Sequence, residues 1–110
     1  MATPSYKVLA QSIPAAVTAT DIYTVPALTQ DVVSTIAVCN QAGADATFRI
    51  AIRVAGLALT AKQYIAYDKA IFANDTEYVT IGATMGAGDI ITVYGSSGSI
   101  SFNVFGTEIA

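Results

Sequence analysis

The sequence predicts an all-β fold, an antiparallel β-sandwich or jelly-roll-like domain of about seven or eight short strands. Apolar residues recur at every second position, which is the period of a half-buried strand and not of a helix. Turn residues separate these segments at intervals of about 8–12 residues, as in sandwiches and barrels. We expect a single sandwich domain over 6–110, preceded by a short N-terminal arm over 1–5.

The clearest strand is predicted over 47–54, where the alternation is unbroken. One face carries Phe48, Ile50, Ile52 and Val54, and the opposite face carries Thr47, Arg49, Ala51 and Arg53. The segment 99–104 alternates in the same way, with its three apolar residues inward. A third apolar face is predicted from Val32 through Ser34 and Ile36 to Val38. Strands of this kind bury one face and leave the other to solvent.

Further strands are predicted over 6–11, 21–25, 62–66, 77–81 and 90–94. The turn residues over 42–45 are expected to link the third and fourth strands as a short hairpin. The segment 55–63 is too short and too glycine-broken for more than a helical turn.

The composition excludes several functional classes. The chain is 54% hydrophobic and 12% charged, which excludes intrinsic disorder. Five basic residues and a net charge of −3 do not make the electrostatic footprint of a nucleic-acid-binding protein. No apolar run reaches the ~18 residues of a membrane span. The first twelve residues do not resemble a secretory signal, so we expect a protein that is used without signal-peptide export.

The reactive residues present argue against an enzyme. Histidine is absent and Cys39 is the only cysteine. This inventory excludes Ser-His-Asp and Cys-His catalysis, zinc sites of His and Cys, and an intramolecular disulfide. Most of the acidic residues lie in or beside predicted turns, without the arrangement of a glycosidase pair or a calcium loop. We expect no catalytic, metal-binding or cofactor-binding residue.

The shortage of charge predicts association with other proteins. Average chains are about 25% charged, and a small domain leaves about a third of its unfolded surface exposed. Much of this surface must therefore be formed by Ala, Thr, Ser, Gly and apolar side chains. Such surface commonly meets another protein, so we expect a stable homo-oligomer or assembly subunit.

Five residues are candidates for an interface: Arg49, Arg53, Tyr64, Tyr67 and Tyr6. The two arginines either face solvent beside cross-strand acids or form salt bridges to a neighbouring subunit. The tyrosines suit an interface or a sugar-binding platform, and core-edge packing with a solvated hydroxyl is the alternative. Opposite strand parity predicts that Tyr64 and Tyr67 do not form one flat platform.

Several strings along the chain form a distinctive series. They are VLAQS (8–12), DIYTVP (21–26), VCNQ (38–41), TFRI (47–50), KQYIAYD (62–68), ANDT (73–76) and SFNVFGTE (101–108). In this order the chain resembles small accessory structural proteins of tailed bacteriophages, including those of cyanobacterial and aquatic phages. The resemblance covers nearly the whole chain and includes no catalytic motif, so no functional residue is carried over.

The resemblance implies a non-enzymatic virion component that is assembled in the host cytoplasm. The leading expectation is a head decoration or cement protein, a trimer or hexamer that stabilises the capsid by contacts with the major capsid protein. The alternative is a tail, baseplate or fibre module that serves assembly or binds host-surface glycans. That alternative predicts a concave or aromatic patch at loops such as 55–63 or 95–98. Neither nucleic acid nor membrane is an expected partner.

Overall fold

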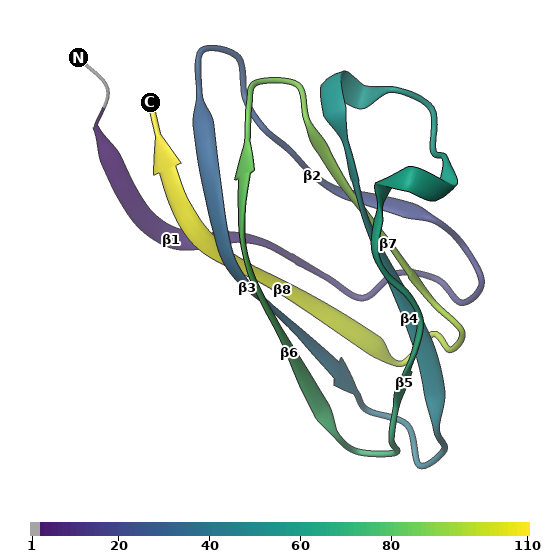
Figure 1. The fold of residues 1–110 in the computed structure, drawn as a ribbon. Coiled ribbons are helices and arrows are strands. Elements are labelled where there is room, and N and C mark those ends of the chain that lie inside the picture. Colours follow the sequence, from purple (N-terminus) through teal and green to yellow (C-terminus); the bar gives the residue numbers. More distant parts are fainter. Residues whose placement is uncertain (1–2) are drawn as a thin grey trace.

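The computed structural model describes residues 3–110 and consists of eight strands with short connections (Figure 1). The all-β class and the expected number of strands are confirmed. The strands are β1 (Pro4–Ser12), β2 (Thr20–Thr24), β3 (Gln30–Asn40), β4 (Ala46–Arg53), β5 (Tyr64–Ile71), β6 (Thr76–Met85), β7 (Ile90–Gly95) and β8 (Ile100–Ile109).

The strands form two four-stranded antiparallel sheets. Sheet A has the order β1-β8-β3-β6, and sheet B has the order β2-β7-β4-β5. Strand β1 therefore pairs with β8, β2 with β7, β3 with β6, and β4 with β5. The chain is one long hairpin that is rolled into two layers, which is a jelly roll. The tip of this hairpin is the loop between β4 and β5.

The core lies between the two sheets. Phe48 of β4 and Phe102 of β8 meet edge to face there, with ring centroids 6.3 Å apart. The inward residues of the central strands surround these rings, and they are Val33, Ile36, Val38, Ile50, Ile91, Val93, Ile100 and Val104. The most apolar strands of the sequence thus occupy the centres of the sheets, where both neighbours are strands.

The alternation over 47–54 is confirmed for most of its length. Phe48 and Ile50 are fully buried, but the strand ends at Arg53, and Val54 is exposed in a 3-10 turn. Ala51 belongs to the outward set and is nevertheless buried. It lies opposite Tyr64 and Thr92 on the two neighbouring strands, whose side chains are larger.

The apolar face predicted from Val32 to Val38 is wrong at its beginning. A bulge at Ser34 adds one residue to β3 relative to β8, because Val33 pairs with Gly106 and Thr35 with Phe105. A bulge inverts the alternation of inward and outward residues. Val33, and not Val32, therefore points into the core together with Ile36 and Val38.

The hairpin predicted at 42–45 is also wrong. Strands β3 and β4 lie in different sheets, and the segment between them crosses from one layer to the other. The buried Asn40 anchors this crossing. Its Nδ2 donates to the carbonyl of Ala44 at 2.9 Å, and its Oδ1 accepts from the amide of Ala42 at 3.0 Å. The turn residues thus mark the passage from one sheet to the other, and the hydrogen bonds of the Asn40 side chain hold this segment in place.

The loop between β4 and β5 contains no regular helix, as expected. It holds two 3-10 turns, η1 (Val54–Gly56) and η2 (Ala61–Gln63). In η2, the Thr60 amide donates to Oε1 of Gln63 at 2.7 Å, which fixes the start of the turn.

The prediction of an N-terminal arm over 1–5 is wrong for residues 3–5, which are paired with the C-terminal end of the chain. Residues 1 and 2 lie outside the described residues. The amide of Thr3 donates to the carbonyl of Ala110 at 2.7 Å, and Pro4 and Ser5 already belong to β1. The described ends of the chain therefore lie side by side at one corner of sheet A (Figure 1).

All four edge strands are interrupted by bulges. Each of β1, β2 and β6 carries one extra residue relative to its neighbour, and β5 carries two. In β6 the bulge includes Gly82, and in β5 it includes Asp68, both with positive φ. A bulge twists an edge and breaks its hydrogen-bonding row, which hinders pairing with a strand of another molecule.

We expect Gly106→Ala to destabilise the fold. Gly106 lies beside the bulge in β3, and a Cβ at this position would collide with the backbone carbonyl of Val32. Overpacking of this kind costs about 1–3 kcal/mol. Thermal unfolding followed by circular dichroism measures the loss. Gly43→Ala is the matched control, because a Cβ at Gly43 has no neighbour within 4 Å, and equal melting temperatures of the two variants would contradict this account.

Candidate binding surfaces

The outward face of sheet B carries a stacked arginine. The guanidinium carbon of Arg49 lies 4.3 Å from the ring centroids of both Tyr67 and Tyr94. Its Nε and Nη2 donate to the two carboxylate oxygens of Asp68, at 2.6 and 3.2 Å. This hydrogen-bonded pairing raises the pKa of Arg49 and lowers the pKa of Asp68. Arg49 is therefore held rigidly by three side chains of its own molecule.

One of the two bulges in β5 brings Tyr64 and Tyr67 to the same face. Tyr64 lies opposite Ala51 and Ala66 lies opposite Ile50, so one residue is inserted between these pairs and Tyr67 points outward like Tyr64. Their rings are in contact, at 4.9 Å between centroids, although the sequence predicts opposite strand parity for the two residues. The rings are nearly perpendicular, at 81°, so they form a corner and not a flat platform.

Arg53 is also paired within the chain. Its Nη1 donates to Oδ1 of Asp21 at 2.8 Å, across the intervening strand β7. Its other donors reach the carbonyl oxygens of Leu57 and Gly56, at 2.8 and 3.0 Å. Asp21 also accepts from the Thr92 hydroxyl, and this bond, with the pairing to Arg53, lowers the pKa of Asp21. Both arginines thus have the cross-strand acidic partners that one of the two alternatives predicts, and Arg53 in addition holds the tip loop.

A concave aromatic cleft lies beside the stacked arginine. It is lined by Leu59, Thr60, Ala61, Tyr64 and Tyr67 and has a volume of about 520 Å³. A hydrogen bond from Nε2 of Gln63 to the carbonyl of Ala58, at 3.1 Å, stabilises the loop at the edge of the cleft. Tyr67 remains 59% exposed and presents its ring to solvent. The cleft lies within and next to the segment 55–63, one of the two loops at which the tail-module alternative predicts a concave or aromatic patch.

The outward face of sheet A is free of charge. Residues directly opposite each other on neighbouring strands share a face, so the strand register defines this surface in rows. We call it the neutral face. Its five rows are Pro4–Ile109–Gln30, Tyr6–Thr107–Val32–Thr84, Val8–Phe105–Thr35–Thr80, Gln11–Asn103–Ala37–Tyr78 and Ser101–Cys39–Thr76. No charged side chain occurs among these described residues.

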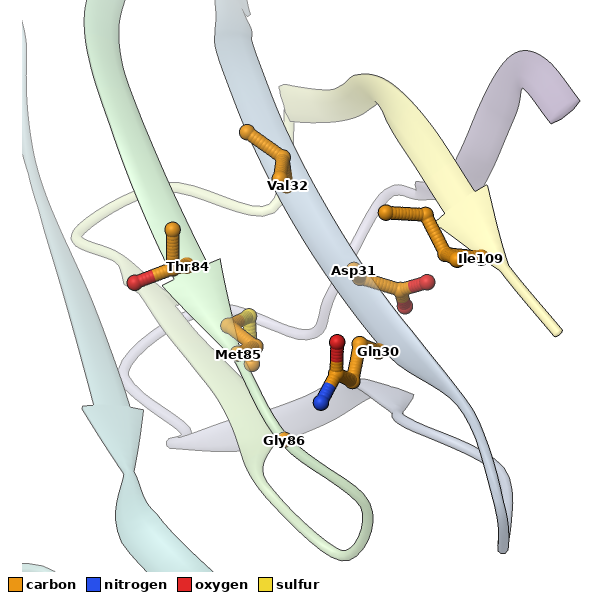
Figure 2. A pocket seen from close by; sticks show the side chains of 7 residues that line it. All are labelled: Gln30, Asp31, Val32, Thr84, Met85, Gly86 and Ile109. Atoms are coloured by element: carbon orange, nitrogen blue, oxygen red, sulfur yellow. The ribbon is translucent and has the colours of Figure 1, made fainter. Parts of the chain in front are cut away.

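Two tyrosines stand at opposite edges of the neutral face. Tyr6 on β1 is 85% exposed, and Tyr78 on β6 is 67% exposed. At one end of the face lies a hollow of about 290 Å³ at the ends of β3, β6 and β8, and the buried acid Asp31 borders it there. Its lining residues are Gln30, Asp31, Val32, Thr84, Met85, Gly86 and Ile109 (Figure 2). The face is thus a broad Thr- and Tyr-rich surface with a shallow depression at one end.

The five predicted interface residues do not form one surface. Arg49, Arg53, Tyr64 and Tyr67 lie on the outward side of sheet B, whereas Tyr6 lies on the neutral face of sheet A. The structure therefore presents two separate candidate surfaces on opposite sides of the sandwich.

A buried acidic cluster at one end of the sandwich was missed by the sequence analysis. Asp31 and Glu108 lie directly opposite each other on β3 and β8, and Asp31 is only 1% exposed. The Tyr23 hydroxyl donates to Oδ2 of Asp31 and lies 3.3 Å from Oε2 of Glu108. Lys7 Nζ lies 2.6 Å from Oε1 of Glu108. Side chains from β1, β2, β3 and β8 therefore meet here and tie the two sheets together.

Burial dominates the electrostatics of this cluster. Loss of solvent raises the pKa of Asp31, and the nearby charge of Glu108 raises it further. Burial and the hydrogen bond to Asp31 also raise the pKa of Tyr23, whereas the bond from Lys7 lowers the pKa of Glu108. Within the described part of the chain, Oδ1 of Asp31 is buried without a hydrogen-bond partner. The sequence does show an acid, Asp31, at the start of an apolar strand. It does not show that Asp31 points inward, because that direction depends on the bulge at Ser34.

Comparisons with known proteins add no assignment. No family model, no curated protein and no solved structure matches the chain. Within residues 3–110, no helix has the length and apolar character to cross a membrane. The same residues include no group of three or more acidic or cysteine side chains placed to hold a metal ion.

We expect Tyr23→Phe to destabilise the protein in a pH-dependent way. Above its folded pKa, the Asp31 carboxylate would lose its donor, which costs about 1–3 kcal/mol for a buried group. Because the pKa of Asp31 is raised on folding, its protonated form favours the folded state, and this contribution is lost as the pH rises through the folded pKa. The loss in free energy of unfolding caused by Tyr23→Phe should therefore become smaller as the pH falls towards about 3.9, the ordinary pKa of Asp.

Chemical denaturation at a series of pH values measures this effect. Tyr78→Phe is the matched control, because the Tyr78 side chain is exposed on the neutral face. Asp31→Asn should remove most of the pH dependence that separates the variant from the wild type. A penalty for Tyr23→Phe that stays constant between pH 4 and pH 7 would show that Asp31 is not its source.

Proposed function

We propose that the chain is a non-enzymatic structural subunit of a tailed-phage virion that decorates and stabilises the head. The observation that carries this proposal is the neutral face. This surface of four strands carries no charge and mixes apolar side chains with Thr, Ser, Gln and Asn, and uncharged surface with exposed apolar side chains commonly serves contact with other proteins. In the assembled particle this face is buried between subunits.

The fold and the sequence resemblance support the same proposal. Jelly rolls occur in viral capsid and lectin domains, but the fold alone does not specify a function. Accessory structural proteins of tailed phages, which the chain resembles, act by contact and need no catalytic residue. The neutral face supplies such contacts through Tyr6, Tyr78 and a central row of Val, Phe and Thr. Many copies on one particle add their modest single contacts to a strong combined attachment.

Localisation on particles tests this proposal. Antibodies against the purified chain should label heads, in immunogold electron microscopy, on virions of the phage that encodes it. Heads that lack the chain should release their DNA at a lower temperature, and addition of the purified protein should restore their resistance. Absence of the chain from virions, or labelling confined to tails and fibres, would overturn the head assignment.

A second candidate function is adhesion to host-surface glycans by a tail, baseplate or fibre module. The aromatic cleft favours it, because an exposed tyrosine ring stacks against the apolar face of a sugar and Thr60 offers polar groups at the rim. The stacked Arg49 holds the Tyr67 ring in place from behind. Sugar recognition needs such a preorganised ring, since mobility would cost affinity.

We expect Tyr67→Ala to weaken any glycan binding by about tenfold or more, the effect of about 1.4 kcal/mol. Screening on a glycan array identifies the ligand, and titration calorimetry then measures its affinity. Phe72→Ala is the matched control, because it removes an exposed aromatic ring that belongs neither to the cleft nor to the neutral face. An array without hits, or equal effects of the two substitutions, would exclude the cleft as a glycan site.

A further inference from the structure

We infer that the neutral face is covered by a second copy of this chain, packed face to face about a two-fold axis. The inference rests on the proposed function in one respect, that this face is buried in an assembly. It names the occupant, which the proposed function leaves open between other virion proteins and the chain itself.

The strand edges direct association to the faces of the sheets. Homotypic association of β proteins commonly extends a sheet through an unpaired edge. Here all four edges, on β1, β2, β5 and β6, carry bulges. Each bulge interrupts the row of amides and carbonyls that a strand of a second molecule would need. The outward faces remain as the surfaces on which a second copy can pack.

The distribution of charge selects sheet A. The chain has five basic and eight acidic residues, and none of them lies among the described residues of the neutral face. Sheet B instead presents the Arg49–Asp68 and Arg53–Asp21 pairs on its outward side. Two copies, each with a net charge of −3, repel each other electrostatically. This repulsion is weakest when the two copies meet through their neutral faces.

The absence of charge on the neutral face also favours a second copy over a charged partner. A charged surface placed against the neutral face would lose water without gaining ion pairs, which is costly. A two-fold contact brings the same surface of each subunit together. Two neutral faces can meet in this way without placing like charges opposite each other. Tyr6 and Tyr78, at opposite edges of the face, contribute large and rigid side chains of the kind that anchors interfaces.

The area of the face is sufficient for a specific pair. Four strands spaced about 4.8 Å apart and about nine residues long, at about 3.3 Å per residue, cover roughly 600 Å². Two such faces bury about 1,200 Å² in total, the lower limit of standard specific interfaces. The expected dimer is therefore reversible in dilute solution and strengthened by many copies on a particle. A two-fold contact also predicts dimers, or hexamers built from three dimers, and not trimers.

Charge substitutions at the centre of the face test the inference. Thr35 lies in the middle row, on the outward side of an inner strand, and Thr24 lies on the outward side of sheet B. Light scattering after size exclusion should give the wild type a mass of twice 11.3 kDa at high protein concentration. Thr35→Lys and Thr35→Glu should each shift the mass to that of the monomer, and Thr24→Lys should leave the dimer intact.

A mixture of the two Thr35 variants gives the sharpest result. Their opposite charges should restore dimers, because face meets face across the two-fold axis. Circular dichroism verifies folding, and the same pair of substitutions at the exposed Thr80, in the same row, replaces Thr35 if either variant unfolds. A wild-type monomer at all concentrations, or a dimer that persists in both single variants, would overturn the inference.

The two proposals fail in different ways. A monomeric chain that still binds to heads would leave the decoration function in place and exclude the second copy. A dimer that the charge substitutions dissociate, together with absence from virions, would leave the second copy in place and exclude the decoration function.

Discussion

The structure depends on the burial of one apolar face of a rolled hairpin against itself. All eight strands contribute inward residues to a single layer between the sheets, with Phe48 and Phe102 at its centre. Each strand must therefore present its apolar residues to the same side along its whole length. The bulges make this possible, because they re-aim side chains where a twisted and coiled strand would otherwise turn its apolar residues outward.

This dependence explains which features were predictable from the sequence. The period-two alternation over 47–54 identified β4 and the inward side of Phe48 and Ile50 correctly, because no bulge interrupts that strand. The inward sides of Val33 and Asp31, and the contact between Tyr64 and Tyr67, were not predictable in this way. A bulge is defined by the count of residues on two paired strands, and the partner of β3 lies more than 60 residues away in the sequence. The crossing at 42–45 was misjudged for the same reason, since turn residues do not show which sheet the next strand enters.

The placement of charge links the fold to both proposed surfaces. Arg49 and Arg53 are paired with acids of their own chain, and their positions on sheet B secure β5 and the tip loop. These ion pairs position the aromatic cleft, because Tyr67 stacks on the guanidinium that Asp68 holds. The remaining charges lie in turns, on the adjoining edges of β5 and β6, or at the end of the sandwich where Tyr23 joins Asp31 and Glu108. Sheet A is therefore left with an outward face of neutral residues alone.

The two surfaces are compatible because they lie on opposite layers. A pair of chains joined through sheet A would direct both aromatic clefts outward, away from the contact and from each other. Two clefts that point in opposite directions cannot both engage one flat surface, so the pair gains no avidity there and would instead link two separate surfaces that carry sugars. Association through the neutral face thus does not compete with adhesion at the cleft. The fold that removes charge from one face and stacks tyrosines on the other is therefore compatible with both proposed roles.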